Sequence, residues 1–538
     1  MTATAAPAGP VARGVARSTV AQLGAKGLHL VLNLVSTLAV IRYLEPGAYG
    51  MYVLALSTTM LVGLFADFGL AKLAVREIAL EAEGEEEILG TVVAARLVLG
   101  VIAIGIAQLL LALLGAPAEV HAAAAVASLL YFGDAILAVV VVFHIRIRQE
   151  YEALIRVGIE LVETALVLTL IARGASLVML FLAPVVATTI GSLVAVWYAR
   201  RRYAIHLRLA PHRVRHLLRE ALPIGPALLI GVIYLKLDGL LLARYRPSEE
   251  VGLYGSAYQP IEYLFLATAV VINVMFPLLA HAHAVGDPTR FENLYRRCTE
   301  TLVAVMLAVP AILLFTAEPL LTLVFGSEYA EASVPLRILA LALVLMTVNG
   351  WQSFVLLAGG HQGVTLRYNL VALVIAAIAG VLLIPGLGMV GAAAAALGTA
   401  IFVLVASTRA VRRNLAVGLQ AGPLVRIIGA GAGLTASLAV ADVAGAPWPT
   451  LVPLALVIYP ALLVGVGVLR PSRIRELWES RTTAPGDVGA VLDGGTVDGP
   501  SAADGAIDLR LSGPIATVVE ADPGVGAAVA AVATGGRS

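Results

Sequence analysis

Two lysines lie inside apolar stretches of this chain, where a charged side chain is costly. Lys26 and Lys236 are two of only three lysines in the sequence, and each occupies a run long enough to cross a bilayer. A charged group in such a span normally faces a cavity or a charged partner. Their chemistry is therefore either the attraction of an anionic ligand or a structural ion pair with a carboxylate, and the sequence leaves both open.

Acidic residues also lie within or at the ends of the apolar stretches. A carboxylate in this position can bind and release a coupling proton or sodium ion, or it can act only as a structural hydrogen-bond acceptor. The candidates for ion coupling are Asp67, Asp134, Asp238 and Glu262. Asp238 is two residues from Lys236, so the two side chains point to different faces of a helix and are not simple partners.

Neutral polar residues in the same stretches could bind the hydroxyl groups of a ligand. The candidates are Asn33, Asn273 and His29, which follows Lys26 by about one turn. Hydrogen bonding between helices is the alternative role. Neither an HExxH motif nor a P-loop nor a nucleophile with its base is present. We therefore expect no enzyme activity, no catalytic residue, no metal site and no cofactor.

The elements that position these residues are 14 apolar stretches, each about the length of a transmembrane helix. Hydrophobic residues make up 60% of the chain and charged residues 13%, too few to cover a soluble protein of this size. Crossing the hydrocarbon core takes roughly 20 apolar residues in a helix. The fold class is an all-α polytopic membrane protein. The weakest of the 14 spans is Leu302–Phe315, which is short and contains Pro310.

The basic residues predict the orientation of these spans. Alternate connections hold 23 lysines and arginines, against four in the other connections. Because Lys and Arg in short loops favour the cytoplasmic side, both termini should be cytoplasmic, in a cell (inner) membrane. A net charge of +1 gives no reason to expect a nucleic-acid partner, and the single cysteine, Cys298, rules out an internal disulfide.

The chain also resembles itself, which suggests its division into domains. At an offset of 202 residues, the identities are Arg42 with Arg244, Tyr43 with Tyr245, Gly50 with Gly252, Tyr52 with Tyr254 and Ala55 with Ala257. Parallel repeats of this kind are a known transporter plan, with the substrate between the halves. The expected segments are a cytoplasmic N-terminus (1–19), helices 1–6 (20–198), a basic linker (199–220), helices 7–12 (221–406), helices 13–14 (407–469) and a cytoplasmic, mostly disordered tail (470–538).

Short motifs in order along the spans carry a family resemblance. They are Gly50-Met51-Tyr52, Ala66 to Leu70, Tyr234 to Asp238, Val251 to Tyr254, Phe325 to Tyr329 and Gly388 to Ala393. Together they resemble the polysaccharide-exporter and lipid-linked oligosaccharide flippase family, whose superfamily includes multidrug exporters and the lipid II flippase. The resemblance implies two six-helix lobes around a central cavity, a C-terminal helix pair, and alternating access.

The resemblance also implies a substrate. It is a polyprenyl-pyrophosphate-linked glycan, moved from the inner to the outer leaflet, with membrane lipids around it and a membrane polymerase of the same pathway as a further candidate partner. Lys26 and Lys236 begin the two lobes, where cationic groups would attract the pyrophosphate in a low-dielectric cavity. Their structural pairing stays the alternative.

Two other functions remain open, and a third is disfavoured. A lipid II flippase shares the plan of 14 spans, although an arginine-rich cavity is expected there. An ion-coupled multidrug exporter usually has 12 spans. A membrane glycosyltransferase needs a large outside loop, and the longest such connection here, about Thr316–Pro335, is too small.

Overall fold

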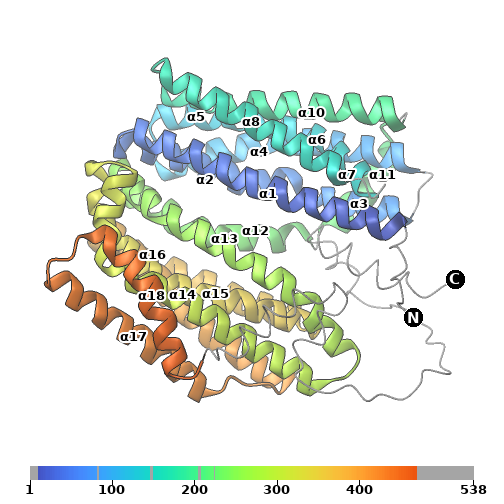
Figure 1. The fold of residues 1–538 in the computed structure, drawn as a ribbon. Helices are drawn as coiled ribbons and strands as arrows, with labels where there is room; N and C mark the ends of the chain where they lie inside the picture. Colours follow the sequence, from blue (N-terminus) through green and yellow to red (C-terminus); the bar gives the residue numbers. More distant parts are fainter. Residues whose placement is uncertain (1–9, 81–83, 146–148, 204–206, 223, 469–538) are drawn as a thin grey trace, which may run out of the picture.

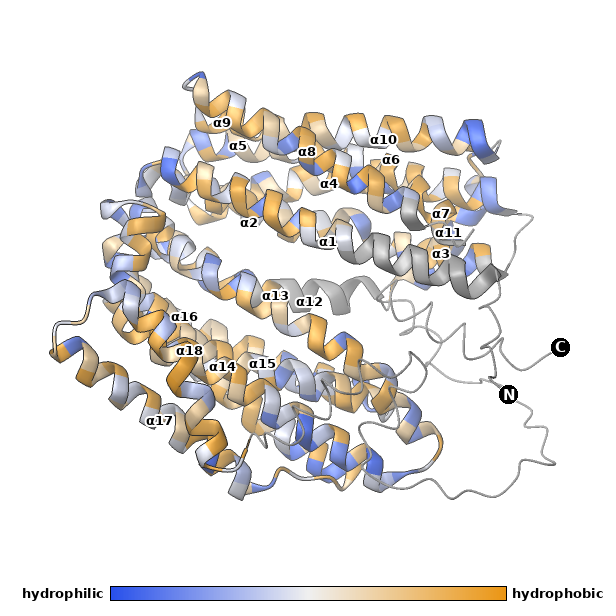
Figure 2. Cartoon of the chain, viewed as in Figure 1, coloured by the Kyte–Doolittle hydropathy of each residue, from blue (hydrophilic) through white to orange (hydrophobic). Residues whose placement is uncertain are grey.

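A computed structural model describes residues 10–80, 84–145, 149–203, 207–222 and 224–468. Every regular element in these ranges is a helix (Figure 1). Figure 2 shows hydrophobic residues along most of the length of these helices and hydrophilic residues gathered near their ends. This distribution is what a helix needs when its middle contacts lipid and its ends contact water.

The first half of the chain forms one group of helices, in the upper part of Figure 1. Its elements are α1 (Pro10–Tyr43), α2 (Pro46–Asp67), α3 (Leu70–Leu80), α4 (Glu85–Leu114), α5 (Ala118–Ala127), α6 (Leu130–Leu137), η2 (Ala138–Val140), α7 (Val141–Ile145), α8 (Gln149–Ala172), α9 (Leu177–Leu180), α10 (Leu182–Tyr203) and α11 (Pro211–Ala221).

The second half forms another group, in the lower part of the same view. Its elements are α12 (Ile224–Tyr245), α13 (Ser248–Ala284), α14 (Pro288–Val324), η3 (Ser327–Ala332), α15 (Ser333–Ala358), α16 (Gln362–Leu415), α17 (Ala421–Val443) and α18 (Trp448–Gly465).

Within the described residues, each of the 14 expected spans lies mostly on helix. Within the described ranges, ten helices are long and apolar enough to cross a membrane, and Gly27–Tyr43 is a shorter apolar helix. The weakest expected span lies inside α14, a helix of 37 residues. The eleventh and twelfth both lie in α16, which breaks at Gly388 (φ 58°, ψ −135°), a conformation open mainly to glycine. These helices support a multi-pass membrane protein.

The segment 199–220, expected to be a basic linker, contains the end of α10 and the amphipathic helix α11. Leu217 on α11 is buried against α3 and α4. Arg76 on α3 donates a hydrogen bond of 2.9 Å to Glu220, and this bond lowers the pKa of the Glu220 carboxyl. The expected tail, 470–538, lies outside the described residues.

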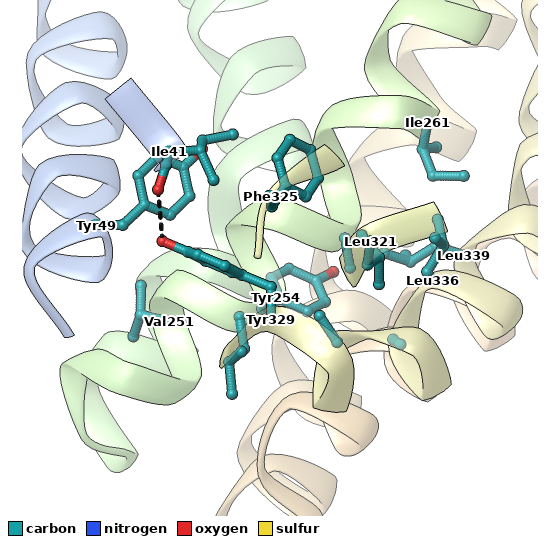
Figure 3. Packing of buried hydrophobic residues seen from close by; sticks show 14 of the residues in the cluster. Ile41, Tyr49, Val251, Tyr254, Ile261, Leu321, Phe325, Tyr329, Leu336 and Leu339 are labelled. Atoms are coloured by element: carbon teal, nitrogen blue, oxygen red, sulfur yellow. Dashed lines mark hydrogen bonds between the residues drawn. The ribbon is translucent and has the colours of Figure 1, made fainter. Parts of the chain in front are cut away.

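The two groups of helices meet mainly through α2 and α13. A buried cluster joins them near the ends of α1 and α12, where α2 and α13 begin. Figure 3 shows Tyr329 of η3 in this cluster with its hydroxyl directed at α1. The hydroxyl donates to the carbonyl oxygens of Ile41 (3.1 Å) and Leu44 (2.7 Å). These carbonyls lie at the C-terminal end of α1, where the helix itself provides no N–H donor for them. In the same region, the guanidinium of Arg42 on α1 donates hydrogen bonds to the backbone carbonyls of Leu323 and Val324 at the end of α14.

Candidate functional site

A cavity of about 320 Å³ lies between the two groups of helices, and its wall contains polar, aromatic and aliphatic residues. Helices α1, α2, α6, α8, α10, α12 and α13 contribute to its wall. Its lining includes the polar and aromatic residues Asn33, Ser36, Thr37, Tyr49, Tyr52, Ser57, Asp134, Glu163, Phe181, Thr188, Lys236, Asp238, Tyr254, Tyr258, Gln259 and Glu262. Residues far apart in the sequence therefore share one space.

Lys236 projects from α12 into this cavity. Its ammonium lies 3.7 Å from the carboxylate of Glu262 on α13 and 5.8 Å from the ring centre of Tyr258. The side chain of Lys236 is 22% exposed and that of Glu262 is 52% exposed, so solvent screens the pair. Lys26 lies on α1, but its side chain is outside the described residues. The role of either lysine in substrate binding stays a prediction.

Asp238 lies two residues after Lys236 and has different partners. Its carboxylate accepts hydrogen bonds from the hydroxyl of Tyr254 on α13 and from the backbone N–H of Gly239. The two charged residues thus have different partners, as their spacing indicates, although both line the cavity. Tyr254 links Asp238 to α13, so this carboxylate joins the two helices as well as facing the cavity.

Asn33 also joins helices at the cavity wall. Its side-chain oxygen accepts a hydrogen bond of 2.7 Å from Tyr263 of α13, whose hydroxyl lies 3.2 Å from Thr37. Both proposed roles, helix contact and cavity lining, are therefore compatible with its position. Asn273 lies further along α13 and is not among the lining residues.

His29 and Asp67 lie away from the cavity wall. His29 Nδ1 lies 2.8 Å from Glu160 on α8, while Arg156, four residues before Glu160, pairs with Glu152. Asp67, at the end of α2, forms an ion pair of 3.2 Å with Arg96 of α4. Asp134 does line the cavity, and Arg96 donates to its backbone carbonyl at 2.9 Å.

Two features of the wall were not predicted from the sequence. The first is Glu163 on α8, which has no hydrogen-bond or ion-pair partner among the described side chains. The second is a row of aromatic rings, in which Tyr52 stacks on Phe181 at 4.6 Å between centres and near-parallel to it. The repeat that aligned Tyr52 with Tyr254 was the signal that could have identified the tyrosines.

The described wall of the cavity carries more acidic than basic side chains. Lys236 is its one described cation, against the carboxylates of Asp134, Glu163, Asp238 and Glu262. Such a wall holds a bound anion only when protons or cations neutralise part of the acidic charge. Among the described residues, no three His, Cys, Asp or Glu side chains are grouped to hold a metal ion.

Part of this sequence matches a known protein family and two curated proteins. The family described as "Polysaccharide biosynthesis protein" matches residues 11–283. A probable low-salt glycan biosynthesis flippase of Haloferax volcanii, Agl15, is 28% identical over 166 residues, which are 31% of this chain and 35% of that protein. The capsular polysaccharide biosynthesis protein CapF of Staphylococcus aureus is 23% identical over 199 residues, 37% of this chain and 50% of CapF.

The match thus spans between about a third and a half of the length of these curated relatives. Among solved structures, the lipid II flippase MurJ in an inward closed conformation superposes with a TM-score of 0.69. The alignment covers 82% of this chain and 98% of MurJ at 11% identity, so it shows a shared fold. Because the family match covers half of the sequence, the chain belongs to the polysaccharide biosynthesis protein family, in agreement with the resemblance seen in its motifs.

Proposed function

We propose that this protein is a flippase that moves a polyprenyl-pyrophosphate-linked oligosaccharide from the inner to the outer leaflet by alternating access. The observation that carries the proposal is a cavity between the two groups of helices whose wall includes polar and aromatic residues, in a chain of this family. Polar and aromatic walls suit sugar hydroxyls and ring faces, while Lys236, together with Lys26 of α1, would attract the pyrophosphate.

The two groups of helices would act as the two six-helix lobes, with α17 and α18 as an accessory pair. We propose that both termini are cytoplasmic and that the protein resides in the cell membrane, because of the 23-to-4 distribution of basic residues. In that orientation the cluster around Tyr329 closes the outer end of the cavity. Membrane lipids and a membrane polymerase of the same pathway are the proposed partners.

The acidic wall supports a role in ion coupling for the carboxylates that line the cavity. An anionic substrate beside Asp134, Glu163, Asp238 and Glu262 needs compensating positive charge, which an ion taken up with the substrate would supply. The same wall also favours a second function, the export of cationic drugs, since four described carboxylates would attract a cation directly.

Reconstitution into proteoliposomes distinguishes the two functions. The probes are a fluorescent polyprenyl-pyrophosphate disaccharide, fluorescent lipid II and a fluorescent lipophilic cation, each assayed with and without the protein. We expect the first probe to become accessible to a membrane-impermeant quencher only in proteoliposomes that contain the protein. Movement of the cation alone would contradict the flippase function and support an exporter. Movement of lipid II in preference to the disaccharide would show that lipid II is the substrate.

A further inference from the structure

The first turns of α2 and α13 contact each other through equivalent residues of the internal repeat. A Cβ atom added to Gly50 would overlap the backbone carbonyl of Ser248, and one added to Gly252 would overlap that of Pro46. Pro46 and Ser248 are separated by the same 202 positions as Gly50 and Gly252. The contact is therefore two-fold symmetric within one chain. We call these four residues the glycine contact.

Only glycine permits this approach. A Cβ on Gly50 would also lie 2.8 Å from the backbone nitrogen of Gly252, and a Cβ on Gly252 would lie 2.8 Å from that of Gly50. Backbone atoms cannot move aside as a flexible side chain can, so a larger residue must separate the helices. One turn further on, Gly255 meets its repeat counterpart, since its Cβ would lie 2.9 Å from a methyl group of Val53.

The glycine contact lies next to the place where the cavity wall meets the buried cluster. Tyr49 and Tyr254, which neighbour the two glycines on α2 and α13, belong both to the cavity wall and to the buried cluster with Tyr329. Tyr49 packs edge-to-face on Tyr329, with 6.2 Å between the ring centres (Figure 3). A substrate in the cavity can pass this end only if α2 and α13 separate here.

We propose that the glycine contact is the seal of this end of the cavity, and that it opens and closes in every transport cycle. Close approach of small residues joins membrane helices without interlocked side chains. Such a contact can separate and re-form without repacking side chains. Because the contact is symmetric, α2 and α13 approach each other most closely at one place, and separation at this place parts both helices.

Labelling of a cavity thiol tests the seal. In a Cys298→Ala background, Ser57→Cys introduces a thiol in the cavity wall, and a membrane-impermeant maleimide is added to one membrane face at a time. Gly50→Ala and Gly252→Ala should each raise labelling from the sealed face severalfold. The matched control is Gly105→Ala on α4, where an added Cβ meets nothing within 4 Å. Unchanged labelling in both seal variants would overturn the proposal.

A reversible cross-link covers the case in which the alanine variants fail to fold. A Cβ on Gly47 would lie 3.9 Å from the hydroxyl oxygen of Ser248, so Gly47→Cys with Ser248→Cys brings two thiols within disulfide reach. Oxidation should stop transport, and reduction should restore it; transport at the uncross-linked rate would refute the seal. Because the labelling arm needs no substrate, it still tests the seal if the proposed substrate proves wrong.

Discussion

Replacing Lys236 tests whether this residue binds the ligand or only forms a structural ion pair with Glu262. At 3.7 Å, and with an effective dielectric constant of about 20, the attraction between Lys236 and Glu262 would be about 4.5 kcal/mol. Glu262 is 52% exposed, so screening reduces this pair to about 1 kcal/mol. A charge-assisted hydrogen bond from Lys236 to a phosphate contributes about 1.5–3 kcal/mol. Losing the ligand contact should therefore outweigh losing the ion pair.

The expected results follow from these two magnitudes. Lys236→Ala should lower kcat/KM for the lipid-linked disaccharide about 10-fold or more, with little change in thermal stability, because each 1.4 kcal/mol corresponds to a factor of about ten. Lys236→Arg should keep more activity, since its charge remains while its geometry changes. Glu262→Gln should lower KM by up to about fivefold, because it frees about 1 kcal/mol of pairing for the ligand.

The assay is initial-rate flipping in proteoliposomes, with protein level and melting temperature measured on the same samples. Lys72→Ala on α3 is the matched control, because Lys72 is not among the lining residues. Normal transport by Lys236→Ala would refute the cavity assignment. Loss of folded protein by Lys236→Ala, reversed by adding Glu262→Gln, would show instead that the pair is structural.

Three further predictions concern orientation, the tail and the break in α16. A reporter active only outside the cell should give no signal when fused after Arg481 and a signal when fused near Glu249; activity at Arg481 would overturn the orientation. Truncation after Arg481 should leave insertion and transport near normal, and lost transport at normal protein level would show that the tail has a function. Gly388→Ala should destabilise the protein by about 1–3 kcal/mol in thermal unfolding, because the added Cβ meets Glu250 at a positive φ. Gly398→Ala, with open space around it, should not destabilise it.

The spans could be predicted from the sequence because the thickness of the bilayer fixes their length. Even Leu302–Phe315 proved to lie within a helix, despite Pro310, since α14 continues well beyond both ends of the apolar run. The helix α11 was not predicted. Its arginines resemble any loop on the cytoplasmic side, and the buried face around Leu217 is formed only by contact with α3 and α4.

The candidate site was less predictable because pairing depends on neighbouring helices. Arg156 can reach an acidic residue four positions away in either direction, and the sequence does not show that His29 of α1 lies beside Glu160. The spacing of Lys236 and Asp238 agrees with their having different partners. The repeat aligned Gly50 with Gly252, but their direct contact follows only from the way the two halves pack.

The carboxylate of Glu250 ties α13 to the break in α16. It accepts a hydrogen bond of 3.0 Å from the backbone N–H of Met389, where the helix restarts after Gly388, and Arg246 at the end of α12 holds the same carboxylate. Glu250 lies two residues before Gly252. These hydrogen bonds link the start of α13 to the end of α12 and to the second half of α16, so we expect the three segments to move together when the start of α13 is displaced.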